Sequence, residues 1–215
     1  IKELSSKIDG ISISTIIGIV GKFGVWKSTM IYNTKQKRKD RENKEKRFEF
    51  DARKYPERKD LRENFILEIA RQINEKEFDQ VLESIDWKKS KNKKKLIDVT
   101  AEFLAQITQI KALDAIKHFG PFIKNTNAKR TFEFQILLNQ LIVSIFSRLS
   151  WENKDKKIVI NIEDIDRSWD AWIYFLETLN HYLRTNNFPW AIICIVPIWS
   201  EIYYQEKYRD SYLKC

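Results

Sequence analysis

The sequence contains little cysteine and no apolar run long enough to cross a membrane. Only two of its 215 residues are cysteines: Cys194 lies inside an apolar segment and Cys215 is the last residue. This usage argues against a disulfide framework and favours a reducing compartment, so we expect a cytoplasmic protein. The longest helix-like apolar stretch, residues 136–146, is interrupted by polar side chains and is too short to span a bilayer. No signal peptide is visible.

Histidine is equally scarce. His118 and His181 are far apart and have no cysteine or histidine at ligand spacing, which favours surface histidines over a metal site. A chain of this length can bury most of its unfolded surface in a single core. Because the sequence begins at Ile1 and ends soon after a late strand, we expect a fragment, or the ordered portion, of a larger polypeptide.

The net charge of +9 comes from two segments. Residues 35–47 and 88–95 carry net charges of +5 and +6, so the rest of the chain is close to −2. Neither segment contains an aromatic residue that could stack on a base, apart from Trp87 at the edge of the second. We therefore expect two solvated, mobile, turn-rich connections, with weak binding of a nucleic acid through its phosphates as the alternative.

The strongest motif is TIIGIVGKFGVWKSTM at residues 15–30, where an apolar run leads into a glycine-containing turn and a helix-like segment. In the pattern G-x-x-x-x-G-K-[ST], Gly21 is the first residue, Lys27 the seventh and Ser28 the eighth, with Thr29 following. Loops of this kind surround a phosphate with backbone N–H groups, while the lysine contacts the outer phosphates and the hydroxyl binds Mg²⁺. The segment predicts a nucleotide site; the alternative is a strand-to-helix turn that happens to carry Lys-Ser.

One position departs from this pattern. Trp26 stands where the second glycine belongs, so an indole either clashes with the phosphates or forces a different loop path. Gly24 recovers part of the missing flexibility. We expect the indole either to point out of the phosphate cradle or to plug it. The predicted nucleotide-binding residues are Gly21, Gly24, Lys27, Ser28 and Thr29.

An acidic strand tip supplies the second half of such a site. Residues 156–167, KKIVINIEDIDR, indicate a buried strand that ends in Glu163 and Asp164. A carboxylate at the tip can hold Mg²⁺ and its water shell, and the next one can polarise the attacking water. We assign Glu163, with Ser28, to the metal and Asp164 to the catalytic base. The alternative is a core strand that ends in a solvated acidic turn.

At this point the chain resembles a known family, the KAP P-loop NTPases, within the wider STAND and AAA-like group of ATPases. The resemblance rests on four segments: residues 21–29, 48–73, 158–167 and 191–198. The usual loop of the family is similar to GPWGSGKSS, and its acidic motif is similar to IDDLDR. The matching residues are Gly21, Gly24, Lys27 and Ser28 in the loop, and Ile162, Asp164, Asp166 and Arg167 in the acidic motif.

The resemblance implies ATP as ligand, Mg²⁺ as cofactor, and assembly into oligomers that drive or gate other modules, including anti-phage systems. Many relatives are membrane-associated, for which this chain shows no segment. Glu163 replaces the first aspartate of the acidic motif and lengthens its reach. Arg167 belongs to the same motif and counts as a catalytic candidate, because it either pairs with Asp164 or reaches the phosphate of a neighbouring subunit.

Alternating strands and helices predict an α/β fold, a mainly parallel sheet flanked by helices. Strands are expected at residues 15–20, 47–51, 158–162 and 191–196. Helices are expected from Lys27 onward and at residues 59–74, 96–118, 131–149 and 167–184, where Trp169 and Trp172 have core spacing. Residues 76–150 are expected to form a helical insertion within one domain that spans residues 1–215.

The predicted function is ATP binding and hydrolysis that drives or gates a larger assembly. The main alternative is a degenerate pseudo-NTPase that serves as an assembly scaffold, with or without nucleotide. A basic nucleic-acid-binding domain is a third interpretation, and only the two lysine-rich segments favour it.

Overall fold

The computed structural model describes residues 2–22, 26–41, 44–55, 61–84, 96–108, 126–148, 156–168 and 171–200. The chain divides into two compact units, one made of residues 1–61 and 152–215 and the other of residues 62–151. The first unit contains the sheet and both sequence motifs, whereas the elements described in the second unit are helices. That residues 76–150 are an insertion within a single domain stays a prediction.

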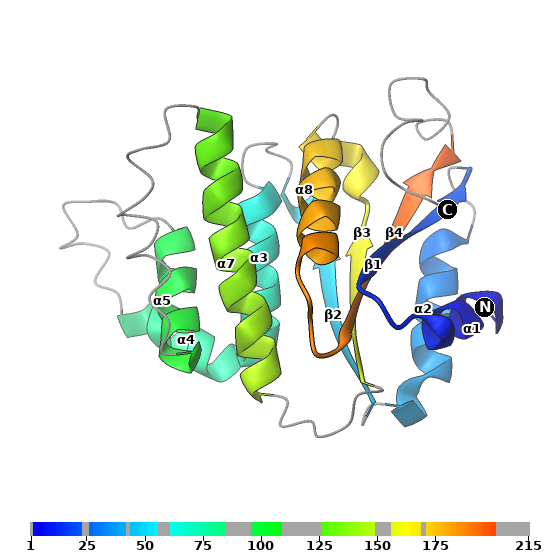
Figure 1. The fold of residues 1–215 in the computed structure, drawn as a ribbon, viewed down its shortest axis with the longest axis horizontal. Coiled ribbons are helices and arrows are strands. Elements are labelled where there is room, and N and C mark those ends of the chain that lie inside the picture. Colours follow the sequence, from blue (N-terminus) through cyan, green and yellow to red (C-terminus); the bar gives the residue numbers. More distant parts are fainter. Residues whose placement is uncertain are drawn as a thin grey trace. The chain divides into compact units, whose positions relative to one another are not determined.

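A parallel sheet of four strands forms the centre of the first unit (Figure 1). The strands are β1 (Thr15–Gly21), β2 (Glu45–Asp51), β3 (Lys157–Glu163) and β4 (Ala191–Trp199), in the spatial order β1-β4-β3-β2. The register places Gly21 opposite Trp199 and Asp51 opposite Glu163, so the strands end together at one edge. The predicted α/β fold with a parallel sheet is therefore confirmed.

Helices α1 (Lys2–Gly10) and α2 (Lys27–Lys37) pack on one face of this sheet. Their contact is a core cluster of aliphatic side chains from both helices and three strands: Leu4, Ile8, Ile17, Ile31, Val159, Ile193 and Ile195. Helix α1 was not among the expected elements. Its buried positions, Leu4 and Ile8, lie one turn apart and pack against the sheet, which stabilises a helix too short to persist alone.

Helix α8 (Ala171–Thr185) covers the opposite face. The ring of Phe175 lies 6.4 Å, centroid to centroid, from that of Phe50 on β2. Phe50 pairs with Ile162 on β3. Successive side chains of a strand point to opposite faces, so Ile162 lies on the face opposite to Val159. Since Val159 packs against α1 and α2, Phe50 and Ile162 lie on the other face of the sheet. Trp172 is almost completely buried, which confirms its predicted place in the core, whereas Trp169 lies outside the described residues.

The second unit contains α3 (Leu61–Ile73), α4 (Glu75–Ser84), α5 (Leu96–Thr108) and α7 (Thr126–Arg148). Within α3, Phe65 and Ile69 are fully buried, as the helical spacing predicts. The rings of Phe78 and Phe103 meet edge to face at 5.1 Å and join α4 to α5. Residues 109–118 of the expected third helix lie outside the described residues. None of the helices described in either unit is long and apolar enough to cross a membrane.

The first basic segment, residues 35–47, is not the solvated connection that its composition predicts. It includes the end of α2, a 3-10 helix at Lys39–Arg41 and the first half of β2. Arg38 is 4% exposed and donates hydrogen bonds of 2.9 and 2.6 Å to the Glu45 carboxylate, which is also buried. The expectation failed because the composition of the segment does not reveal that Arg38 and Glu45, seven residues apart within it, pair with each other in the interior. The second basic segment, residues 88–95, lies outside the described residues.

Candidate nucleotide-binding site

The predicted phosphate loop joins β1 to α2. Strand β1 ends at Gly21, and α2 begins at Lys27 with Trp26 as its N-cap residue. No side chain caps this helix, and the Met30 N–H donates back to the Trp26 carbonyl at 2.7 Å. The N–H groups of Lys27, Ser28 and Thr29 therefore have no acceptor within the helix. Unpaired N–H groups at the positive end of a helix suit an anion.

Lys27 folds back over this loop. Its ammonium group donates hydrogen bonds to the carbonyl oxygens of Gly21 and Lys22, both at 2.9 Å. Its alkyl chain passes over Gly21, where an added Cβ would lie 3.5 Å from the Lys27 Cδ atom. Neutral carbonyls bind an ammonium group less strongly than an anion does. We therefore expect a bound phosphate to displace these carbonyls as the partner of the Lys27 ammonium group.

The side chain of Trp26 is exposed to solvent. Its side chain is 77% exposed, the largest exposure among the exposed large apolar residues of the described part of the chain. Of the two alternatives for the indole, this arrangement matches the one in which it points out of the cradle. Ser28 and Thr29 are also exposed in the first turn of α2, while Gly24 lies outside the described residues.

The acidic tip of β3 contacts an arginine to which the sequence analysis assigned no role. Arg53, in the 3-10 helix Ala52–Lys54 directly after β2, lies 2.9 Å from the Asp164 carboxylate and 3.1 Å from that of Asp51. Asp164 has a positive φ of 51°, a left-handed conformation that aspartate and asparagine tolerate better than other non-glycine residues. Asp164 therefore combines an unusual backbone conformation with a side-chain contact to Arg53.

Glu163 has a different environment. Within the described part of the chain, its carboxylate has no hydrogen bond and no ion pair. Burial raises its pKa above the ordinary value, and the negative charges of Glu49, Asp164 and Asp51 raise it further, against a smaller opposing effect of Arg53. A half-buried, unpaired carboxylate surrounded by like charges is poised to accept a cation.

Asp166 is a second residue whose contact could not be identified from the motifs. Its carboxylate accepts a hydrogen bond of 2.8 Å from the Trp199 backbone N–H and so ties the segment after β3 to the end of β4. Arg167 belongs to the 3-10 helix Ile165–Ser168, but its side chain lies outside the described part of the structure. The two alternative roles of Arg167, an ion pair with Asp164 and a contact with the phosphate of a neighbouring subunit, both stay predictions.

The sheet brings the two motifs to the same edge. Neighbouring strands are about 4.8 Å apart, so β1 and β3, which β4 separates, are about 10 Å apart. A triphosphate on the α2 N-terminus and a cation at Glu163 fit such a separation. Mg²⁺ commonly takes one or two carboxylates together with phosphates and water, so the lack of any cluster of three potential ligands in the described residues is compatible with it.

The raised pKa of Glu163 predicts a pH-dependent effect on stability. Because the folded-state pKa lies above the unfolded one, the ionised carboxylate destabilises the ligand-free fold as pH rises through that range. Glu163→Gln should therefore raise the melting temperature at pH 7, by about 1–4 °C, and this gain should vanish below about pH 4. Thermal denaturation followed by circular dichroism over this pH range measures the effect.

Glu75→Gln is the matched control for this variant. Glu75 is exposed, pairs with Arg71 and is not among the charges that act on Glu163, so its neutralisation should leave the melting temperature at pH 7 unchanged or slightly lower. Adding Mg²⁺ with ATP should stabilise the native chain more than Glu163→Gln. A Glu163→Gln variant that melts below the native protein at pH 7 would contradict the assignment of an unpaired carboxylate.

Comparison with known proteins agrees with this geometry. The family model of the KAP family P-loop domain matches residues 1–195. The chain belongs to this family. Searches of curated proteins and of solved structures give no match. Membership supports nucleotide binding by a P-loop NTPase domain, while the roles of individual residues rest on the contacts described above.

Proposed function

We propose that this domain binds ATP with Mg²⁺ and hydrolyses it at the C-terminal edge of the sheet. Lys27 and the first-turn N–H groups of α2 hold the phosphates, with Gly21, Gly24 and Thr29 completing the loop. Ser28 and Glu163 hold the metal. The observation that carries the proposal is the unpaired, half-buried carboxylate of Glu163 on the edge where Lys27 closes over the loop.

Asp164 is the proposed general base, which orients the attacking water and accepts its proton. Bound Mg²⁺ would polarise the phosphate oxygens and offset the negative charge that develops on them. Arg53 acts as a positioning residue in this proposal, since it holds the Asp164 carboxylate at 2.9 Å. Arg167 is the candidate for a contact with the transferred phosphate, in the same subunit or in a neighbouring one.

Isothermal titration of the chain with ATP, with and without Mg²⁺, tests binding, and release of inorganic phosphate tests turnover. We expect binding that tightens in Mg²⁺, together with slow hydrolysis. The pseudo-NTPase alternative is favoured by Trp26, which replaces a glycine of the motif, and it predicts binding without phosphate release or no binding at all.

The proposed output of hydrolysis is the driving or gating of a larger assembly that acts in defence against phage. Only the family resemblance supports this part of the proposal. Sedimentation velocity in ATP and in ADP tests it, because a gating ATPase changes its assembly state with the bound nucleotide.

Restoring the glycine at position 26 should strengthen ATP binding. Trp26→Gly removes the Cβ and admits the positive φ values that anion-binding loops use. We expect the affinity to rise about fivefold, the factor that corresponds to ~1 kcal/mol. Trp26→Ala is the matched control, since it removes the indole but retains the Cβ, and it should give a smaller gain.

The opposite result has a defined meaning. If both substitutions at position 26 weaken ATP binding, the exposed indole supports the ligand directly, most simply by stacking on the base. That result would contradict the interpretation of Trp26 as an obstacle in the loop.

A further inference from the structure

Strand β3 carries one polar side chain in an otherwise apolar run. Residues 158–162 read IVINI, and Asn161 is the polar residue among them. Asn161 is 1% exposed, and its amide oxygen has no hydrogen-bond donor among the described residues. A buried amide without a hydrogen bond destabilises a fold, and leucine would fill a similar volume without this cost. Such an oxygen is a candidate for a partner that the ligand-free chain lacks.

The register of the sheet places Asn161 on the face that α2 covers. Asn161 pairs with Ile195 on β4, and paired residues of neighbouring strands point to the same face. Ile195 belongs to the core cluster that also contains Ile31 of α2. Because Ile31 lies one turn beyond Lys27, where the helix begins, this part of the sheet lies under the first two turns of α2.

Glu163 lies on the same face, two residues further along β3. Side chains two residues apart in a strand point to the same side, and their Cα atoms are about 6.6 Å apart. The proposed metal ligands, Ser28 in the first turn of α2 and Glu163 at the end of β3, thus belong to the two elements that meet at Asn161. The unpaired amide oxygen of Asn161 and the unpaired carboxylate of Glu163 are neighbours on one surface.

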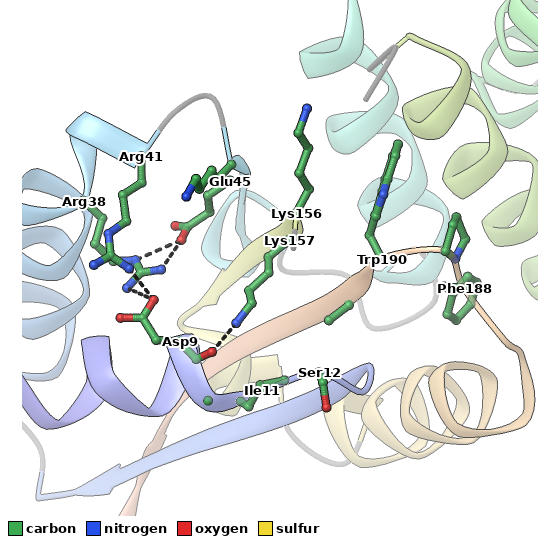
Figure 2. A pocket seen from close by; sticks show the side chains of 14 residues that line it. Asp9, Ile11, Ser12, Arg38, Arg41, Glu45, Lys156, Lys157, Phe188 and Trp190 are labelled. Atoms are coloured by element: carbon green, nitrogen blue, oxygen red, sulfur yellow. Dashed lines mark hydrogen bonds and ion pairs between the residues drawn. The ribbon is translucent and has the colours of Figure 1, made fainter. Parts of the chain in front are cut away.

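Two cations that α2 brings to this face are already paired. Arg38, the C-cap residue of α2, donates to Glu45 at the beginning of β2 (Figure 2). Glu49 is the residue of β2 that pairs with Asn161 in the sheet, and its carboxylate forms an ion pair with Lys35 of α2. These two cations therefore neutralise carboxylates, and the Asn161 oxygen stays without a donor.

We propose that Asn161 is a positioning residue of the Mg²⁺ site, whose amide oxygen accepts a hydrogen bond from a water molecule of the metal's hydration shell. This inference rests on the proposed function. The phosphates of ATP are acceptors and do not satisfy this oxygen, whereas water bound to Mg²⁺ is a strong donor. Mg²⁺ keeps several of its waters in proteins. Asparagine is one methylene shorter than glutamate and Asn161 starts further from the edge than Glu163, so a water spans the remaining distance.

Asn161→Leu tests the proposal in the full chain. The measurement is the gain in affinity for a non-hydrolysable ATP analogue that Mg²⁺ produces, followed by isothermal titration. This gain should be about tenfold smaller in the variant, the usual effect of losing an outer partner of a metal site. The melting temperature of the ligand-free variant should be unchanged or up to about 4 °C higher, because the unpaired amide is gone. A purely structural role of Asn161 predicts the opposite, a lower melting temperature.

Asn161→Asp is the second variant, because it retains an acceptor oxygen and adds a negative charge. It should retain the full gain from Mg²⁺, while the added charge beside Glu163 lowers the melting temperature of the ligand-free chain. Asn180→Leu is the matched control. Asn180 is a buried amide of α8, on the other face of the sheet, so its replacement should leave the gain from Mg²⁺ as it is in the native chain.

Two results would overturn the inference. One is an undiminished gain from Mg²⁺ in Asn161→Leu, and the other is a smaller gain that comes with a lower melting temperature and that Asn161→Asp does not restore. If Asn161→Leu does not fold, a reduced gain in Asn161→Asp contradicts the inference by itself. A native chain whose affinity for the analogue does not respond to Mg²⁺ would instead contradict the proposed function, so the two failures can be distinguished.

Discussion

Lys27→Ala is expected to lose about 10- to 100-fold in ATP affinity, with an unchanged melting temperature. Charge-assisted hydrogen bonds contribute about 1.5–3 kcal/mol each, which corresponds to this range of affinity. The contacts of the Lys27 ammonium group in the ligand-free protein are with two loop carbonyls at its surface. Removing them leaves the core under α2 intact. Isothermal titration and a thermal melt together measure both quantities.

Lys22→Ala is the matched control for the Lys27 variant. Both changes remove one positive charge from the same loop, but Lys22 is exposed and contributes only its backbone carbonyl to the contacts described. A purely electrostatic effect of the loop would weaken ATP binding similarly in both variants. Equal losses, or full ATP affinity in Lys27→Ala, would rule out the proposed role of Lys27.

The strands could be predicted from the sequence because burial leaves a local pattern. β3 and β4 are buried on both faces over most of their length and therefore appear as continuous apolar runs. β2 was expected to begin at Arg47, but it begins at Glu45. Its first residues are charged, and they join the sheet because Arg38 neutralises Glu45 in the interior, a contact between side chains that no local pattern reveals.

The site was only partly predictable for the same reason. Gly21, Lys27 and Glu163 follow from motif spacing, whereas the pairing of Arg53 with Asp164 joins residues more than a hundred positions apart. One signal was available: Arg53 follows the end of a parallel strand, and such ends meet at one edge of the sheet.

The largest expected effect on catalysis is that of Asp164→Asn. If Asp164 accepts the proton of the attacking water, its amide replacement should reduce turnover by about 10²- to 10⁴-fold, the usual contribution of a general base. ATP affinity should change little, because the carboxylate acts in the transition state rather than in the bound ground state. Phosphate release under saturating ATP and a separate binding titration distinguish the two quantities.

Asparagine is the informative replacement because of the backbone at this position. Asp164 has φ of 51°, which asparagine tolerates, whereas alanine would add strain that could be mistaken for a catalytic defect. The amide oxygen can also still accept a hydrogen bond from Arg53, so the positioning contact at 2.9 Å can be retained. A loss of turnover in this variant therefore reports the missing negative charge.

Asp51→Asn completes this experiment as its matched control. Asp51 contacts the same Arg53 guanidinium at 3.1 Å but stands at the end of β2. Burial raises its pKa, but the hydrogen bonds and charge of Arg53 outweigh burial and leave the pKa below its ordinary value. The control should retain most of the turnover. If Asp51→Asn and Asp164→Asn lose turnover equally, the acidic tip acts through Arg53, and Asp164 is not the base. If neither variant loses turnover, hydrolysis does not depend on this tip.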